Sequence, residues 1–203
     1  MTAFLNNLQN FMGNFFNFQV VKLFPRHSVR FAKNYFENKP LIVAEIGTFR
    51  GENALSMLKE LNIKKLYIID PYEYYEKYKD RENDKNEKVL SDAFKIAKKR
   101  LKSYSSKIVF IKRYSNEAIK DIPLCDFVYI DGNHTYEFVK EDIQNYFLKL
   151  NSDGILAGHD ITNKKFNQDI VRAVIEFSYK NKLVPFVSRT DWWILKRNKI
   201  ALS

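Results

Sequence analysis

The chain has 203 residues, 45% of them hydrophobic and 29% charged, which is the composition of a folded globular domain rather than of a disordered or fibrous chain. Its single cysteine excludes an internal disulfide, and no apolar run is long enough to predict a transmembrane helix, so we expect a reducing, cytoplasmic location. The net charge of +10 favours anionic partners, although a solvated lysine-rich surface would give the same value.

The first 24 residues are rich in Phe and Asn and carry one charge, Lys22. Their larger apolar residues recur near helical spacing, which predicts a helix that packs on the domain or on a second subunit. A substrate lid or a contact with a membrane surface would suit the same residues. We therefore treat residues 1–35 as an N-terminal helical and aromatic appendage, through which a homodimer could form, and residues 36–203 as one domain.

From residue 41 onward, apolar runs alternate with amphipathic stretches. The apolar runs predict strands buried on both faces at residues 41–47, 65–70, 107–111, 126–131 and 154–160. The amphipathic stretches predict helices around residues 53–61, 90–101, 139–150 and 170–177. Residues 72–88 mix acids and bases and predict a solvated loop or flap.

Two further apolar runs, at residues 183–187 and 192–196, close the chain with four residues between them. Four residues cannot form a parallel crossover, so these strands form an antiparallel hairpin. The predicted fold is α/β: a doubly wound, Rossmann-like sheet of seven strands, five parallel plus the C-terminal antiparallel hairpin, with helices on both faces. In such sheets the ligand lies beyond the carboxyl ends of the strands.

A loop with two glycines, Gly47 and Gly51, follows the first strand in "AEIGTFRGE" and opens a helix. Glycines allow a tight turn and close approach of a ligand, and the helix N-terminus offers free N–H groups. Asp70 comes 19 residues after Gly51, at the end of the second strand, where an acid can accept both hydroxyls of a ribose. Together these residues indicate a nucleoside site.

Glu45 lies inside the first apolar strand, where an unpaired carboxylate is costly. A neighbouring Lys or Arg could pair with it, or a ligand with an amino group could. The loop lacks the G-x-G-x-x-G pattern of dinucleotide oxidoreductases. S-adenosylmethionine, which carries an amine, a carboxylate and adenosine but no phosphate, would suit this loop.

The motifs "EIGTFRG", "IIDP", "YIDGNHTYE" and "AGHDI", in this order, resemble class I S-adenosylmethionine-dependent methyltransferases over residues 35–197. Within these, the chain is similar to the small O-methyltransferases that act on sugars and catechols. Their fold has an antiparallel seventh strand, which agrees with the predicted hairpin. The resemblance implies a cofactor site made by Glu45, Gly47, Thr48, Gly51, Asn53, Asp70, Ser115, Asn116 and Asp131. In it, Asn53 would donate to the cofactor carboxylate, a place where relatives often have Ser.

The resemblance also implies a divalent cation, Mg²⁺ or Mn²⁺, held by Asp131, His159 and Asp160. Relatives usually have Asp followed by Asp or Asn at the last two positions, and a histidine shifts the preference toward Mn²⁺, Zn²⁺ or Fe²⁺. Alternatively, His159 and Asp160 cap the next helix or bond the loop backbone.

His134 stands three residues beyond Asp131, at a position where relatives often have a Lys that acts as base. A histidine can do that task at neutral pH, which makes His134 and Asp131 the candidate catalytic residues. The alternative is a turn residue bonded to backbone.

The expected activity is O-methylation of a small molecule or sugar, with an anionic acceptor favoured by the positive charge. Eight bases and no acids lie between Ala93 and Asn116, which keeps an RNA or other nucleic-acid methyltransferase as the first alternative. The Asn/Asp-Pro-Pro-aromatic motif of base N-methyltransferases does not follow the fourth strand, so there is no firm nucleic-acid signal. A catalytically silent nucleotide-binding protein is the second alternative.

Overall fold

The computed structural model describes residues 24–74, 87–163 and 167–199. The predictions for the N-terminal segment (its helix, lid, membrane contact and subunit interface) lie outside the described residues, as does most of the flap predicted at residues 72–88.

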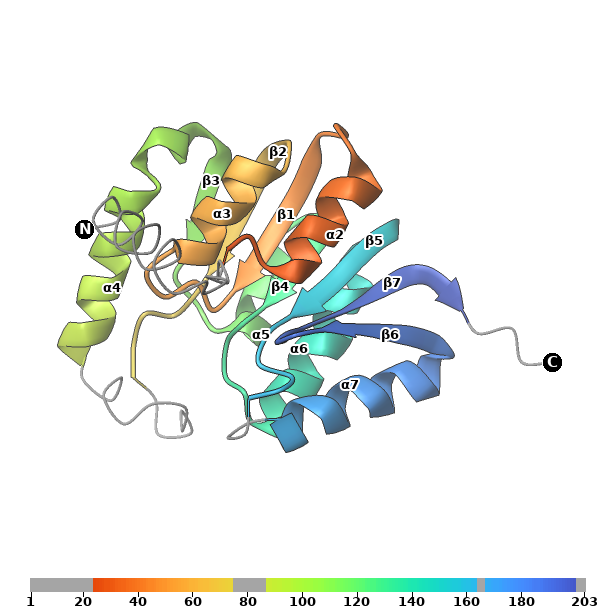
Figure 1. The fold of residues 1–203 in the computed structure, drawn as a ribbon. Helices are drawn as coiled ribbons and strands as arrows, with labels where there is room; N and C mark the ends of the chain where they lie inside the picture. The colour runs from red at the N-terminus through yellow and green to blue at the C-terminus, as the bar shows by residue number, and fades with distance from the viewer. Residues whose placement is uncertain (1–23, 75–86, 164–166, 200–203) are drawn as a thin grey trace, which may run out of the picture.

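Seven strands form one sheet in the order β3-β2-β1-β4-β5-β7-β6 (Figure 1). The strands are β1 Leu41–Ile46, β2 Ile63–Ile69, β3 Ile108–Ile111, β4 Cys125–Ile130, β5 Leu150–Gly158, β6 Leu183–Ser188 and β7 Asp191–Lys199. The helices are α2 His27–Phe36, α3 Glu52–Glu60, α4 Glu87–Arg100, α5 Ser115–Ala118, α6 Tyr136–Leu148 and α7 Asn167–Asn181, with short 3₁₀ helices η2 Lys102–Lys107 and η3 Ile119–Asp121.

The sheet confirms the predicted topology. Strands β1 to β5 pair in parallel, whereas β7 is antiparallel to both of its neighbours, β5 and β6. The last strand of the chain therefore lies inside the sheet, and the strand before it forms the edge. The carboxyl ends of all five parallel strands meet at one edge, as the fold prediction requires.

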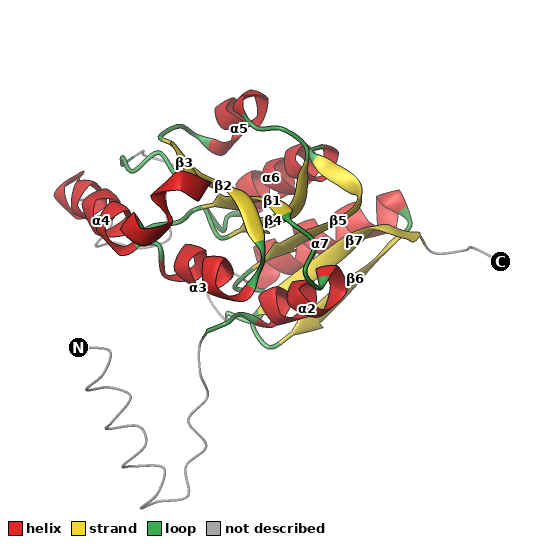
Figure 2. Ribbon diagram, turned by 90° about the horizontal axis from the view of Figure 1, so that it is seen from above, coloured by secondary structure: helices red, strands yellow, loops and turns green. Residues whose placement is uncertain are grey.

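Helices cover both faces of the sheet, α2 and α3 on one side and α5 and α6 on the other (Figure 2). The central strands β1 and β4 are buried because each of their faces packs on a helical layer, whereas β3, expected to be buried on both faces, is only half-buried. In β4, Phe127 and Tyr129 face the layer with α2 and α3, and Val128 and Ile130 face the layer with α6 and α7. Cys125 begins this strand and is fully buried, as expected of a core residue.

Helix α2 lies almost wholly within residues 1–35, which the sequence marks as a helical appendage, and it shares a core with the sheet. Its Val29, Ala32 and Phe36 lie on one face and are buried with strand residues. The start of α2 is thereby held close to the carboxyl ends of β4 and β5. Over the described ranges, no helix combines the length and the apolar character needed to cross a membrane.

Candidate functional site

The loops that follow β1 to β5 surround a cavity of about 690 Å³. Its wall contains most of the residues singled out from the sequence: Glu45, Gly47, Thr48, Asn53, Asp70, Ser115, Asn116, Asp131, His134, His159 and Asp160. Gly51 is not part of this wall. It adopts φ 78° directly before α3, and a Cβ there would lie 3.3 Å from Leu101 Cδ1, so its backbone serves the turn and close helix packing.

Glu45 is 1% exposed and is held by two side chains of the following loop and helix. Thr48 Oγ1 donates to Glu45 Oε2 at 2.7 Å, and Asn53 Nδ2 donates to Glu45 Oε1 at 2.9 Å. Burial raises the pKa of Glu45 to about 8 in spite of these hydrogen bonds. Among the residues that the structure describes, no lysine or arginine pairs with it, so a cationic ligand group would be its natural partner.

Asn53 differs from its expected role as a donor to a ligand carboxylate. Its amide nitrogen is directed at Glu45, and its buried Oδ1 has no hydrogen-bond partner within residues 24–74, 87–163 and 167–199. The atom that Asn53 offers to a ligand is therefore an acceptor. An ammonium group placed between Glu45 and Asn53 would satisfy both oxygens.

Gly47 brings the loop after β1 against the loop after β4. Its φ is 79°, and a Cβ built on it would lie 2.2 Å from the carbonyl oxygen of Asp131. Asp131 N in turn donates to Ile46 O at 2.8 Å. A side chain at position 47 would force these two loops apart, which explains why glycine is required here.

Asp70 is fixed at the end of β2 by backbone donors. Phe49 N donates to Oδ2 at 2.9 Å and Tyr72 N donates to Oδ1 at 2.8 Å. Burial raises the pKa of Asp70, against the lowering effect of these N–H groups. The backbone of Thr48 is a third donor to this carboxylate, which has about four acceptor positions, so it can still accept from a ribose hydroxyl.

Asp142 is a site residue that the sequence analysis missed. It is 3% exposed and lines the cavity beside Ser115 and Asn116. Burial raises its pKa to about 7, against the hydrogen bond from Ser115. The signal was available, because Asp142 interrupts an apolar helical face formed with Val139 and Ile143.

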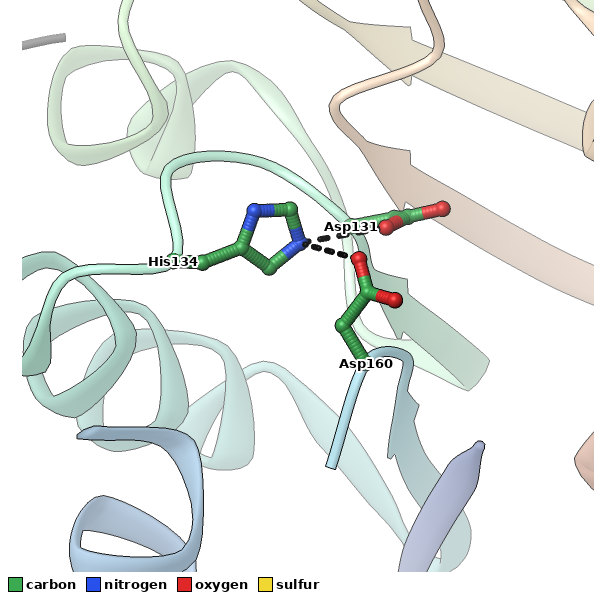
Figure 3. Close-up of side chains that lie close together, drawn as sticks. All are labelled: Asp131, His134 and Asp160. Atoms are coloured by element: carbon green, nitrogen blue, oxygen red, sulfur yellow. Dashed lines mark hydrogen bonds and ion pairs between the residues drawn. The ribbon is translucent and has the colours of Figure 1, made fainter. Parts of the chain in front are cut away.

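Asp131, His134 and Asp160 come together from two neighbouring strand ends (Figure 3). His134 Nε2 lies 3.3 Å from Asp131 Oδ1 and 3.3 Å from Asp160 Oδ2. One ring nitrogen that faces two carboxylates calls for positive charge between them, either a proton on the imidazole or a metal ion.

His159 lies beside this cluster, but both of its ring nitrogens have protein partners. Nδ1 is 3.0 Å from Asp160 Oδ1, and Nε2 accepts from the guanidinium of Arg26. Burial would raise the pKa of Asp160, but the hydrogen bond from His159 and the charges of both histidines outweigh it and lower this pKa to about 2.

The geometry fits a divalent cation at Asp131, His134 and Asp160, each of which offers one ligand atom within 4.8 Å of the others. Two carboxylates and an imidazole suit Mn²⁺ or Mg²⁺. The expected set had His159 in the place of His134. His159 Nδ1 lies 3.8 Å from Asp131 Oδ1 and is directed toward Asp160 instead.

Phe24 and Arg26 also line the cavity and were not predicted. Arg26 lies 133 residues before His159 in the chain. No local pattern marks it, because its place depends on how α2 docks on the sheet.

The sequence profile of a methyltransferase domain family, methyltransferase family 24, matches residues 44–161. An uncharacterized protein of Acanthamoeba polyphaga mimivirus is 30% identical over 156 residues. That match covers 73% of this chain but 64% of the viral protein, which is less than two thirds of its length.

Solved structures share the fold at low identity. A protein of Staphylococcus aureus assigned as a caffeoyl-CoA O-methyltransferase has a TM-score of 0.59 at 12% identity, over 93% of this chain and 90% of that one. The O-methyltransferase NovP has a TM-score of 0.59 at 14% identity, over 85% and 78%. The MycE methyltransferase of the mycinamycin biosynthetic pathway, solved with Mg, SAH and mycinamycin VI, has a TM-score of 0.57 at 15% identity, over 97% and 56%. At such identities the likeness shows the fold alone.

Proposed function

The chain belongs to methyltransferase family 24, whose members have the class I S-adenosylmethionine-dependent fold, and on this premise we propose that it methylates a hydroxyl group of a small molecule or sugar. The observation that carries the proposal is the contact between Gly47 and Asp131. It sets the cluster of Asp131, His134 and Asp160 directly against the cofactor loop.

The cofactor half of the cavity suits the methionine end of S-adenosylmethionine. Glu45 and the free Oδ1 of Asn53 would accept from its ammonium group, and Asp70 would accept from the ribose. Ser115 and Asn116 would lie near the adenine. Glu45, Asn53 and Asp70 would thus provide hydrogen-bond acceptors for the cofactor. Ser115 and Asn116 would line the cavity around the adenine.

The reaction needs a deprotonated oxygen held in line with the methyl group. S-adenosylmethionine supplies the methyl on a sulfonium, whose carbon–sulfur bond breaks as the carbon–oxygen bond forms. The neutral ring of His134 would accept the hydroxyl proton at Nε2, which supplies the positive charge that the two facing carboxylates stabilise. Asp131 and Asp160 would hold the ring and stabilise the imidazolium that results.

A metal ion, where bound, would be held by Asp131, His134 and Asp160 and would polarise the acceptor oxygen as a Lewis acid. His134 Nε2 cannot bind a metal and accept a proton at the same time. We propose proton transfer as the main role of His134 and metal assistance as the alternative use of the same cluster.

The charge of the cavity favours a small acceptor over a nucleic acid. Of the residues that the structure describes, nine acidic ones and two arginines line it: Glu45, Glu52, Asp70, Glu73, Glu117, Asp131, Glu141, Asp142 and Asp160, with Arg26 and Arg50. Phosphodiesters would be repelled there, whereas the cationic cofactor would be attracted. The same balance favours a neutral or cationic acceptor over the anionic one suggested by the net charge.

Calorimetry with S-adenosylmethionine, with and without Mg²⁺ or Mn²⁺, followed by a panel of sugar and aryl hydroxyl acceptors, tests the proposal. We expect micromolar cofactor binding, and methyl transfer to at least one acceptor class. If the cofactor does not bind at millimolar concentration, the proposal fails.

His134→Ala separates an enzyme from a silent nucleotide-binding protein. With an acceptor in hand, we expect turnover to fall about 100-fold or more, because a positioned base contributes at least that much. Cofactor affinity, measured by calorimetry, should stay within about threefold because His134 lies on the acceptor side. Unchanged turnover would remove His134 from the mechanism, and binding without any turnover in the wild type would favour the silent protein.

A further inference from the structure

Arg26 lies at the acceptor side of the cavity although it comes from outside the family-matched region. It directly precedes α2, and its side chain is 17% exposed. One guanidinium nitrogen donates to His159 Nε2, and the other lies 4.0 Å from Asp131 Oδ2. A fixed positive charge therefore lies beside Asp131, one of the three residues of the candidate metal cluster, and beside the neighbouring His159.

The segment that carries Arg26 is anchored firmly. Two residues later, Ser28 N and Ser28 Oγ donate to Asp191 Oδ2 at 2.9 and 2.6 Å, and Asp191 is 1% exposed. The ring of Phe24 packs on the guanidinium with its centroid 5.0 Å from Cζ. Since backbone and side chain are both held, the charge of Arg26 is a permanent part of the site.

This charge acts on the cluster in two ways. The guanidinium balances part of the negative charge of Asp131, one of the two carboxylates that face His134 Nε2 (Figure 3). It also keeps His159 Nε2 engaged, which leaves this histidine unable to rotate toward a metal ion without losing that bond. A divalent cation at Asp131 would have to bind against a like charge several ångströms away.

We propose that Arg26 is a built-in cation that limits divalent-metal binding at Asp131, His134 and Asp160, so that His134 Nε2 stays available to the acceptor. The inference rests on the proposed function in taking this cluster as the reacting side of a methyltransferase. In this account the charge of Arg26 disfavours metal binding at the cluster and thereby favours proton transfer by His134.

Titration with Mn²⁺, followed by calorimetry and by the electron paramagnetic resonance signal of the free ion, tests this directly. Arg26→Met removes the charge and keeps most of the apolar stem, and we expect it to tighten Mn²⁺ binding about tenfold or more, as loss of a nearby like charge predicts. Arg26→Lys keeps the charge and should stay much closer to the wild type. Arg26→Gln serves in place of the Met variant if that variant does not fold.

The matched control is Arg50→Met, which removes the other arginine of the cavity wall. Arg50 stacks over Phe49 at 5.0 Å on the cofactor side, and we expect Mn²⁺ affinity to change by less than about threefold. Asp160→Asn in the Arg26→Met background should abolish the increase in Mn²⁺ affinity. That result would show that the ion binds at the cluster.

Unchanged or weaker Mn²⁺ binding in Arg26→Met overturns the inference, as does an equal gain in Arg50→Met or no Mn²⁺ binding by any variant at millimolar concentration. S-adenosylmethionine titrated into the same preparations reports on the proposed function separately. Loss of cofactor binding in the wild type would defeat the methyltransferase proposal, whereas the Mn²⁺ comparison would still give its own result.

Discussion

At the scale of single residues, Glu45 combines a structural cost with the binding role proposed for it above. Its carboxyl is fully buried, and burial raises its pKa from 4.5 to about 8. Between these two values the folded protein holds a proton that the unfolded chain has released. The free energy of unfolding without cofactor therefore falls as pH rises from about 4.5 to about 8, because the folded state must either keep the proton or bury a charge.

Glu45→Gln should remove this cost. Without cofactor at pH 8, the free energy of unfolding of the variant should be about 1–3 kcal/mol higher than that of the wild type. This difference should shrink as the pH is lowered toward 5. Cofactor affinity should fall at the same time, because a neutral amide replaces the partner of the ammonium. Urea unfolding at several pH values and calorimetry check the two effects.

Glu52→Gln is the control, since Glu52 is an exposed acid at the start of α3. Its stability should follow the pH profile of the wild type. A Glu45→Gln variant that is less stable than the wild type at pH 8 would contradict the account of the buried carboxyl.

The sequence predicts which residues come together at the site better than it predicts the orientations and hydrogen-bond partners of their side chains. Asp131, His134 and Asp160 end adjacent parallel strands, so strand order alone places them together. The amide orientation of Asn53 and the partner of His159 depend on rotamers and on contacts made by Arg26 from far away in the chain. Such details follow from packing, which no local pattern records.

At the scale of elements, the loops after β1 and β4 form the joint between the two halves of the site. Their contact leaves no room for a side chain at Gly47, where a Cβ would lie 2.2 Å from Asp131 O. The glycine loop thus positions the cluster of Asp131, His134 and Asp160 and, in the function proposed above, the cofactor as well. The apolar runs predicted both strands, but this contact between their loops became visible only in the assembled sheet.

Gly47→Ala should disrupt both functions of this joint. The clash and the φ of 79° should lower the free energy of unfolding by about 2 kcal/mol or more, and cofactor binding should be lost. Gly132→Ala is the matched control in the facing loop, where the nearest atom to a Cβ is Ile46 Cγ2 at 3.5 Å. Its stability should change by less than about 1 kcal/mol. Equal effects of the two variants on thermal unfolding would contradict this account.

At the scale of the whole molecule, charge is divided between the cavity and the exterior. The net charge is +10, yet nine acidic residues and two arginines line the cavity in the described part of the chain. None of the eight bases between Ala93 and Asn116 is among the described residues of the cavity wall. The basic stretch and the acidic cavity wall therefore belong to different surfaces of the described part of the chain, which the sequence could not show because it does not place charges in space.

We expect RNA to bind the exterior weakly, with affinity that falls steeply as salt rises, and without becoming a substrate. Cofactor affinity should change by less than about twofold when RNA is present, because the phosphates would contact a surface outside the cavity. Filter binding across salt concentrations and transfer of labelled methyl groups check both points. Transfer of a labelled methyl group to RNA would contradict this prediction and would favour a nucleic-acid methyltransferase instead.

The position of β7 has a consequence for biosynthesis. This strand, from Asp191 to Lys199, lies between β5 and β6, and its Asp191 holds the segment that carries Arg26. A nascent chain that has not yet released these residues from the ribosome exposes the edge of β5 and leaves Arg26 without its anchor. Strands β1 to β5 can pair with one another during translation, whereas the segment that carries Arg26 is anchored only once β7 has been released. Ribosome-stalled chains that end before β7 should accordingly stay dependent on chaperones until synthesis resumes.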